Sequence, residues 1–183
     1  QIADDLVSQY PVHVLHRPGK LGLATAALDG FRQGRGEILC IMDVDGSHPP
    51  AAIAEMFEIL RRRPEIDCVV GSRYVPGGAT KGWPFYRQFA SWLARAVAWP
   101  ITSVRDSTSG FLMFRRGLVS KLRAVGGFKI GLEILCLLPA ARVAEVPITF
   151  NDRAAGQSKM GRKEITAYLR QLPGLYRRRF LKF

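Results

Sequence analysis

Cysteine is scarce in this sequence of 183 residues. The three cysteines, Cys40, Cys68 and Cys136, lie far apart within apolar runs and show no metal-ligand spacing. This pattern excludes a cysteine-based metal cluster and gives no support to a disulfide framework. We expect three small, buried hydrophobic side chains in a protein of a reducing compartment.

Long apolar runs are also absent. No stretch reaches the roughly 18 apolar residues that cross a bilayer, and no signal peptide is visible. The sequence has no internal repeats and no low-complexity linker, so it predicts a single domain over residues 1–183. The chain opens at Gln1 without a methionine, and its first predicted strand comes only at Val12. We therefore expect it to start inside a natural domain.

Acidic residues are few compared with basic ones. The chain has 15 Asp and Glu against 27 Lys and Arg, which gives a formal net charge of +12 at pH 7. Such an excess predicts an anionic partner, which could be nucleic acid, anionic lipid or a phosphorylated substrate. A basic surface that only aids solubility is the alternative.

Apolar periodicity predicts alternating strands and helices in the first part of the chain. Short apolar runs indicate buried strands, and apolar stripes with helical spacing indicate helices. In chain order we expect a strand at 12–16, a helix from 21 to about 34, a strand at 38–42, a helix from 50 to about 60, and a strand at 67–71. This alternation predicts an open α/β sheet with right-handed crossovers, whose ligands bind beyond the carboxyl ends of the strands.

The second half is less regular. It predicts a loop at 77–82, an aromatic-rich helix at 83–101, a strand at 111–114, a helix at 130–138, a strand-like segment at 143–150, and a helix from 161 that Pro173-Gly174 interrupts and that ends in a basic tail at 177–182.

Asp43 and Asp45 stand where a predicted buried strand ends. Two carboxylates two residues apart at a turn can share one hard cation, and Mg²⁺ or Mn²⁺ would keep coordination positions open for phosphate. Such a cation would neutralise a diphosphate leaving group. The alternative is a helix cap with a second turn carboxylate.

Three other segments offer phosphate or hydroxyl ligands. Arg73 follows the strand at 67–71 and should reach the same edge of the sheet as Asp45, where it could bind phosphate in bidentate fashion. Asp106 opens a polar loop and could bond sugar hydroxyls. A second polar loop carries Arg153, Ser158 and Lys159, which could clamp phosphates. Plain surface turns are the alternative in each case. The three histidines (His13, His16 and His48) show no metal spacing and are interpreted as non-catalytic.

Taken together and in this order, these segments resemble one family. The chain resembles the polyprenol- or dolichol-phosphate mannosyltransferases of glycosyltransferase family two. The match covers nearly all of the chain and runs through 17–23, 42–49, 71–78, Trp83-Pro84 with Arg87 and Ser91, 106–111, and Arg153 with Gly156, Ser158 and Lys159.

The resemblance implies an α/β fold of the GT-A (Rossmann-like) type, with an open, mostly parallel sheet and flanking helices. It also implies a metal-dependent, inverting enzyme that transfers mannose from GDP-mannose to a polyprenyl or dolichyl monophosphate. Carried over by motif, Asp43 and Asp45 would bind Mg²⁺ or Mn²⁺. The other implied roles are donor binding (Lys20, Asp43, Asp45, Ser47, Arg73, Asp106), acceptor-phosphate binding (Arg73, Arg87, Ser91, Arg153, Lys159) and catalysis (Asp45, Arg73, Arg87, Arg153).

The sequence departs from the family pattern at two places. Many members have Gln where this chain has Ser47, whose shorter side chain would reach a metal through water. The family's first strand, with its Pro-x-Tyr-Asn-Glu segment and following acidic motif, is absent, so we expect an N-terminally truncated domain. That missing segment holds the nucleotide base and ribose.

The chemistry of the acceptor fits the residue types present. A phosphate monoester is already anionic at neutral pH, so it needs positioning and charge compensation rather than a strong base. The sequence has many loop arginines and no clear His–carboxylate pair. The helices at 83–101 and 164–183 could lie in a membrane interface, which predicts a cytoplasmic protein bound peripherally to the cytoplasmic face of a membrane.

Three alternatives stay open. One is a lipid-phosphate glucosyltransferase or another family-two enzyme that uses a UDP-sugar, and another is an inactive, truncated domain. The third is a basic nucleic-acid-binding module. We expect no nucleic acid, because the aromatic residues gather in an apolar helix and do not alternate with basic residues on a strand platform.

Overall fold

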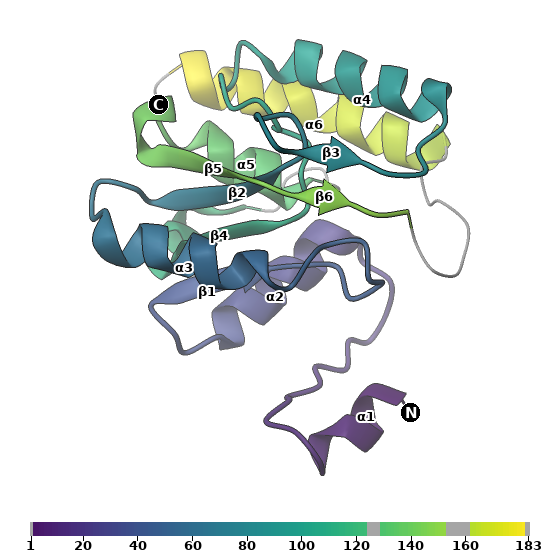
Figure 1. The fold of residues 1–183 in the computed structure, drawn as a ribbon, viewed down its shortest axis with the longest axis vertical. Helices are drawn as coiled ribbons and strands as arrows, with labels where there is room; N and C mark the ends of the chain where they lie inside the picture. The colour runs from purple at the N-terminus through teal and green to yellow at the C-terminus, as the bar shows by residue number, and fades with distance from the viewer. Residues whose placement is uncertain (1, 124–128, 153–161, 182–183) are drawn as a thin grey trace.

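A four-stranded sheet forms the centre of the molecule, with the spatial order β1–β4–β2–β5 (Figure 1). Its strands are β1 (Ile38–Ile41), β2 (Cys68–Ser72), β4 (Leu112–Arg115) and β5 (Val143–Pro147). The structure is a computed structural model, and it describes residues 2–123, 129–152 and 162–181. Strand β4 is antiparallel to both β1 and β2, whereas β5 is parallel to β2. Strands β1, β2 and β5 therefore share one direction, as the prediction of a mostly parallel sheet requires.

A second, small sheet pairs β3 (Ala79–Thr80) with β6 (Thr149–Phe150) in parallel. The predicted strand at 143–150 is thus divided between two sheets. The division falls at Ile148, whose N–H donates to the carbonyl of Ser72 at 2.9 Å. The second sheet brings the chain after β6 back toward the turn after β1, where Asn151 N–H donates to the carbonyl of Ser47.

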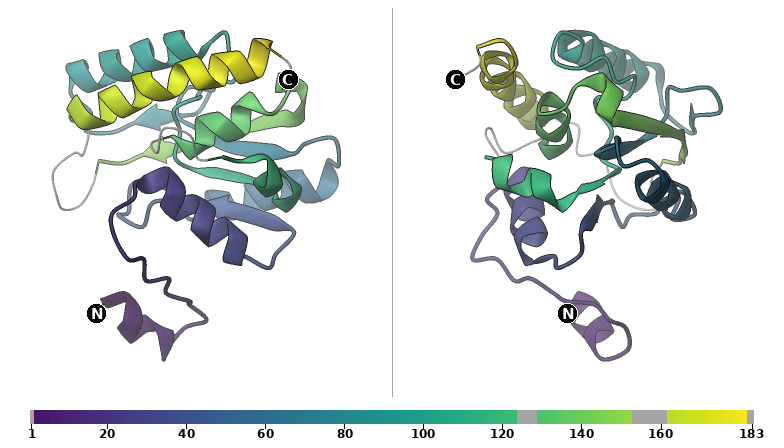
Figure 2. Two further views of the ribbon diagram at one scale, coloured as in Figure 1. Left: turned by 180° about the vertical axis from the view of Figure 1, so that it is seen from behind. Right: turned by 90° about the vertical axis from the view of Figure 1, so that its left-hand side faces the viewer.

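Helices cover both faces of the central sheet (Figures 1 and 2). The α-helices are α1 (Ile2–Val7), α2 (Leu23–Gln33), α3 (Ala52–Arg62), α4 (Phe85–Ala98), α5 (Ile130–Cys136) and α6 (Arg162–Phe180). Two 3₁₀ helices, η1 (Arg116–Lys121) and η2 (Ala140–Arg142), lie before α5 and β5. The predicted helices at 21–34, 50–60, 83–101 and 130–138 correspond to α2, α3, α4 and α5.

The alternation of side chains along β4 separates the two main cores. Leu112 and Phe114 pack with residues of α2 and α5, where the ring of Phe31 meets that of Phe114 edge to face at 5.0 Å. Met113 points to the other face and packs with Met56 of α3. Because both faces are covered, β1 and the first three residues of β2 and β4 are continuously apolar.

Helices α4 and α6 lie side by side beyond α5 (Figures 1 and 2). Apolar side chains of α4, α5 and α6 form a third core cluster. The hydroxyl of Tyr168 in α6 donates to the carbonyl of Ala94 at 2.8 Å, and that of Tyr176 donates to the carbonyl of Val97 at 2.5 Å. These contacts fix α6 along the inner side of α4 and leave the other side of α4 at the surface.

Three predictions about local structure are wrong. Residues 12–16 form no strand and lie in an extended segment that joins the outlying helix α1 to the body of the protein (Figure 1). Helix α6 passes through Pro173 without a break. Pro173 is exposed and Leu169, whose carbonyl loses its helical partner there, is 53% exposed, so water can reach that carbonyl. Cys40 is exposed on β1, whereas Cys68 and Cys136 are buried as predicted.

None of the helices within the described ranges combines the length and the apolar character that crossing a bilayer would require.

Candidate active site

The turn after β1 carries Asp43 and Asp45. Both residues are half-buried, whereas Val44 between them is 96% exposed, so the two carboxylates share the inner side of the turn. Gly46 has a φ of 79°, in the left-handed region where a side chain would be strained, and this lets the chain reverse directly after Asp45. The N–H and the hydroxyl of Ser47 both donate to Oδ1 of Asp45. Ser47 therefore orients Asp45.

His48 contacts the same turn from the interior of the protein. Its side chain is buried, stacks on Phe111 with ring centroids 5.2 Å apart, and meets Phe150 edge to face. The backbone N–H of Asp43 donates to His48 Nδ1 at 3.1 Å. Burial lowers the pKa of His48, which favours the neutral ring that this acceptor role needs. His48 was not among the predicted site residues, because no spacing in the sequence links it to the Asp43 backbone.

Arg73 and Asp106 form a buried ion pair. Arg73 Nε and its backbone N–H donate to Asp106 Oδ2 at 2.7 and 2.9 Å, and Nη2 donates to Oδ1 at 2.7 Å. Nη2 also donates to Thr108 Oγ1 at 3.0 Å. Burial acts to raise the pKa of Asp106, but the hydrogen bonds from Arg73 outweigh it and hold that pKa below its usual range. Both oxygens of Asp106 are thus committed to Arg73, so the geometry makes Asp106 a support for Arg73; its predicted contact with donor hydroxyls stays a prediction.

The indole of Trp83 brings Arg73 and Arg87 together. The guanidinium carbons of Arg73 and Arg87 lie 4.9 and 4.2 Å from the centre of this ring. Phe150 meets the indole edge to face at 5.4 Å. Arg87, from the first turn of α4, donates from Nη1 to Asp152 Oδ1 at 2.9 Å. Because cations are attracted to the faces of indole rings, Trp83 holds two arginines of distant segments in one place.

Ser91 lies one turn further along α4 and is buried. Its hydroxyl is 2.8 Å from that of Tyr74, the residue after Arg73. The predicted acceptor residues Arg73, Arg87 and Ser91 are therefore connected through Trp83 and Tyr74.

The acidic turn and Arg73 belong to one electrostatic environment. The charges of Asp43, Arg73, Asp45 and Lys129 all act on the pKa of His48. Lys129, just before α5, donates from Nζ to the carbonyl of Thr108 at 3.0 Å. Burial, followed by the charge of Arg73, lowers the pKa of Lys129 to about 8, while Asp106 and Asp43 act in the opposite direction.

Lys129 had no signal in the sequence, because no motif marks it. Gly110 also belongs to this region: a Cβ built on it would lie 3.8 Å from Asp43 Oδ2 and 3.6 Å from the His48 ring. Gly110 therefore lies next to both Asp43 and His48.

Lys20 and three loop residues are not placed in this cluster. Lys20 is exposed in the segment before α2, which Arg17 anchors through Asp29 and Thr25. Arg153 and Lys159 lie outside the described residues, as does Ser158. Their predicted roles stay predictions.

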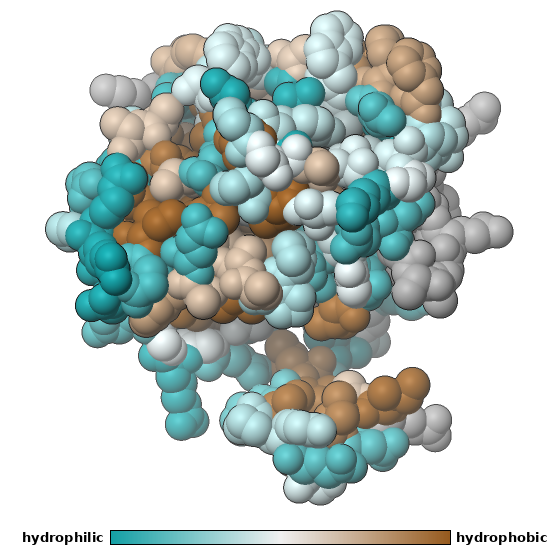
Figure 3. All heavy atoms as spheres, viewed as in Figure 1, coloured by the Kyte–Doolittle hydropathy of each residue, from teal (hydrophilic) through white to brown (hydrophobic). Residues whose placement is uncertain are grey.

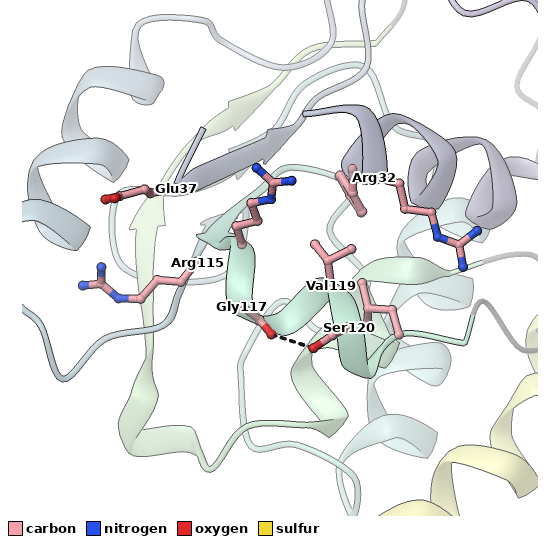
Figure 4. A pocket seen from close by; sticks show the side chains of 9 residues that line it. Arg32, Glu37, Arg115, Gly117, Val119 and Ser120 are labelled. Carbon is pink, nitrogen blue, oxygen red and sulfur yellow. Dashed lines mark hydrogen bonds between the residues drawn. The ribbon is translucent and has the colours of Figure 1, made fainter. Parts of the chain in front are cut away.

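A surface pocket of about 700 Å³ lies away from this cluster (Figure 4). Glu37, Arg115 and Ser120 are among the residues that line it. Glu37 immediately precedes β1, whereas Asp43 follows it, so the pocket is at the opposite end of that strand. A smaller pocket of about 290 Å³ is lined by residues that include Tyr74, Phe89 and Arg95, and it adjoins the arginine side of the cluster.

The donor atoms suit a divalent cation held jointly with a ligand. Within the described ranges no group of three or more His, Cys, Asp and Glu side chains could enclose a metal. Mg²⁺ and Mn²⁺ at phosphate sites use one or two carboxylates and take their remaining ligands from phosphate and water. Asp43 and Asp45 supply such a pair.

Comparisons with known proteins agree with this arrangement. The model of the family Glycosyl transferase family 2 matches residues 1–123. The chain is 39% identical over 176 residues to a dolichol-phosphate mannosyltransferase of Pyrococcus furiosus, covering 93% of this chain and 49% of that protein. It is 39% identical over 177 residues to a dolichol-phosphate mannosyltransferase of Saccharomyces cerevisiae (91% and 65%), and 38% identical over 177 residues to a polyprenol monophosphomannose synthase of Mycolicibacterium smegmatis (90% and 66%). The chain thus spans about half to two thirds of the length of these relatives.

Solved structures show the same fold. Glucosyl-3-phosphoglycerate synthase of Mycobacterium tuberculosis, solved with Mn²⁺, UDP-glucose and glycerol 3-phosphate, matches with a TM-score of 0.59 at 20% identity, over 91% of this chain and 56% of that one. The predicted GT-A fold is therefore confirmed. With the family model covering most of the chain and an acidic turn beside clustered arginines, this protein belongs to glycosyltransferase family 2.

Proposed function

We propose that the protein is an inverting mannosyltransferase that moves mannose from GDP-mannose to a polyprenyl or dolichyl monophosphate. The observation that carries the proposal is the joining of an acidic turn and an arginine pair in one site, with Arg73 and Arg87 on the same indole. A reaction between a sugar diphosphate and a phosphate monoester needs a place for each anionic group. The names of the relatives support the same reaction.

On the donor side, Asp43 and Asp45 would hold Mg²⁺ or Mn²⁺. The cation supplies charge compensation for the departing diphosphate. Ser47 orients Asp45 through two hydrogen bonds, and the His48 ring fixes the backbone of Asp43. Lys20 would reach the donor phosphates from the surface. A turn fixed in this way needs little rearrangement when the donor binds.

On the acceptor side, Arg87 and Ser91 of α4 would bind the phosphate monoester together with Arg73, and Arg153 and Lys159 would add further positive charge for it. Arg73 has two of its three nitrogens engaged by Asp106, which leaves Nη1 to face a ligand. The acceptor carries its own negative charge, so its oxygen can attack without a strong general base. His48 is compatible with this mechanism, because its Nδ1 is occupied by the Asp43 backbone.

The lipid end of the acceptor would follow α4. The 290 Å³ pocket combines the aromatic rings of Phe85, Phe89 and Trp92 with the guanidinium of Arg95. These rings are at least half exposed, and Figure 3 shows apolar atoms at the surface over one end of this helix. An amphipathic helix with exposed aromatic and basic residues suits the surface of a membrane, so we place the protein peripherally on a cytoplasmic membrane face.

Donor binding is tested by calorimetry with GDP-mannose, with and without Mn²⁺ or Mg²⁺. We expect metal-dependent binding that Asp45→Ala abolishes and that Asp5→Ala, on the exposed helix α1, leaves unchanged. UDP-glucose provides the competing donor. Metal-independent binding that survives Asp45→Ala would exclude the metal site, and a preference for UDP-glucose would indicate a glucosyltransferase.

Acceptor binding is tested by measuring mannose transfer to polyprenyl phosphate. We expect Arg87→Ala to raise the KM for the acceptor and to spare GDP-mannose binding. Arg116→Ala provides a matched control, because Arg116 is an exposed arginine at the opposite end of β1. An equal loss of donor and acceptor binding would show that Arg87 does not act specifically on the acceptor.

A further inference from the structure

The indole N–H of Trp83 is a buried donor without an acceptor. Only 9% of Trp83 is exposed, and its Nε1 makes no hydrogen bond within the described part of the chain. Native structures pair the great majority of buried polar groups, and an exception calls for a missing partner. Nε of the neighbouring Arg87 is buried and unpaired as well. The guanidinium carbon of Arg87 lies 4.2 Å from the centre of the Trp83 ring, so the two unpaired donors belong to side chains in contact and indicate a site for a ligand rich in acceptors.

The stacking role of Trp83 does not satisfy this group. The two guanidiniums lie over the indole ring, whereas the N–H bond lies in the plane of that ring and points outward from its edge. The carbonyl of Trp83 already accepts from Gln88 Nε2, but that bond uses the backbone. The N–H therefore needs an oxygen beside the ring, close to two positive charges.

The charges around Trp83 indicate which kind of oxygen would accept a hydrogen bond from its N–H. The charge of Arg73 is paired with that of Asp106. The charge of Arg87 is paired with that of Asp152, through Nη1. Arg87 Nε and the indole N–H are both buried, and neither has an acceptor among the described residues. A phosphate monoester brings three oxygens that can each accept hydrogen bonds, and bonds to such an anion are stronger than those to a neutral group.

We propose that Trp83 is a further acceptor-binding residue, whose indole N–H donates to an oxygen of the phosphate monoester beside Arg87. The inference rests on the proposed function, because it takes the acceptor to be a prenyl phosphate. Its ring keeps Arg73 and Arg87 in place, and its N–H fixes the orientation of the phosphate between them. Trp83 thus selects for the doubly anionic end of the acceptor.

The direct test is the indole ¹⁵N–¹H spectrum of the protein, titrated with geranyl phosphate as a soluble prenyl monophosphate. The protein has three tryptophans, and Trp83→Phe identifies the signal of Trp83. We expect that signal to move downfield and saturate with geranyl phosphate, and to stay in place with geraniol. Exposed Trp99 serves as the internal control. An unmoved Trp83 signal, or no binding of geranyl phosphate at all, would overturn the proposal.

A kinetic test separates hydrogen bonding from stacking. Trp83→Phe keeps a six-membered aromatic face for the arginines and removes the pyrrole ring together with its N–H. We expect the KM for the acceptor to rise about tenfold, the size of one hydrogen bond to an anion, with no change in the KM for GDP-mannose. Trp99→Phe should leave both values unchanged. An unchanged acceptor KM, or an equal rise for donor and acceptor, would refute the proposal. If the protein transfers no mannose, the proposed function fails, and the spectrum still decides whether Trp83 binds a phosphate.

Discussion

Arg73 and Asp106 form a buried ion pair, so a substitution of either residue also affects the other. Neither charge can be removed alone without leaving the other uncompensated in the interior. Breaking such a pair from one side costs about 3–5 kcal/mol, which is a large part of the stability of a domain. The intact pair adds little net stability, because the cost of burying both charges offsets their attraction, and its main effect is to keep Arg73 in one position.

We expect Asp106→Asn to lower the free energy of unfolding by roughly 3 kcal/mol, because the neutral amide leaves the Arg73 charge unbalanced. Urea denaturation measures this change. Glu58→Gln provides the control, since it breaks ion pairs with Arg61 and Arg62 on the exposed surface of α3 and should have little effect. Equal effects of the two variants would show that Asp106 is not the essential partner of Arg73.

Lys129 should make stability depend on pH above neutrality. Its pKa in the folded protein is about 8, below its ordinary value of 10.5, because burial and the charge of Arg73 outweigh Asp106 and Asp43. The unfolded chain therefore binds more protons than the folded one between these values, and the contribution of Lys129 to stability rises as the pH increases through that window.

The measurement compares the unfolding free energy of the protein with that of Lys129→Met between pH 7.5 and about pH 10. We expect the difference to move in favour of the unsubstituted protein with rising pH, by on the order of 1–3 kcal/mol in total. A difference that is independent of pH would show that Lys129 titrates normally.

Residues in the site differed in how far the sequence could predict them. Asp43 and Asp45 could be predicted, because a buried apolar run leads directly into them. Arg73 could be placed at the same edge for the same reason. His48, Trp83 and Lys129 could not be assigned roles in the site, since their contacts are with backbone atoms and ring faces that only the tertiary structure brings near.

At the scale of elements, the turn between β2 and β3 depends on a close approach of backbone to backbone. A Cβ on Gly78 would lie 2.6 Å from the carbonyl oxygen of Ser72 and 2.7 Å from the carbonyl carbon of Arg73. The N–H of Gly78 also donates to the carbonyl of Val75 at 2.8 Å, which closes the turn. Any side chain at residue 78 must move the backbone that carries Arg73.

We expect Gly78→Ala to destabilise the protein by about 1–3 kcal/mol and to weaken acceptor binding, because the displaced backbone misplaces Arg73. Gly30→Ala is the matched control: Gly30 lies on the exposed side of α2, and a Cβ there meets nothing within 4 Å. That substitution should be neutral or stabilising by up to about 1 kcal/mol. Denaturation and acceptor titration check both variants. Full stability of Gly78→Ala would contradict the close approach.

The helices and strands were predicted correctly where the local sequence pattern alone determines them. The apolar runs of β1 and β2 and the stripes of α2 and α3 are visible in the sequence. The segment at 12–16 has the composition of a strand, but a strand also needs a neighbour for its backbone, and none pairs with it among the described residues. The antiparallel direction of β4 could not be predicted either, because a short apolar run is compatible with both parallel and antiparallel pairing.

At the scale of the whole molecule, the net charge of +12 and the exposed aromatic side of α4 predict attraction to anionic membranes. Basic residues near such a surface each contribute about 1 kcal/mol, and salt screens that contribution. Figure 3 shows that hydrophobic and hydrophilic residues are interspersed over the face of the molecule in view. Binding should therefore depend on α4 in particular, in addition to the overall charge.

We expect the protein to sediment with phosphatidylglycerol vesicles at low salt and to be released at high salt. The double substitution of Phe85 and Phe89 by serine should weaken this binding, because it removes rings that are 81% and 54% exposed. Phe57→Ser is the control, since Phe57 is 44% exposed on α3, away from α4 (Figure 1). If the double variant and Phe57→Ser weaken vesicle binding equally, α4 is not the contact surface.

The antiparallel insertion of β4 between β1 and β2 has a consequence for how the protein acquires its site. The acidic turn and Arg73 are synthesised first, yet their strands become neighbours of a common partner only when residues 112–115 enter between them. The loop that supplies Asp106 arrives with that same strand, so Arg73 has no counter-charge before then. Pairings between segments so distant in sequence form slowly. We therefore expect a nascent chain to carry Asp43, Asp45 and Arg73 well before they are brought together, and the site to form in a late step of folding.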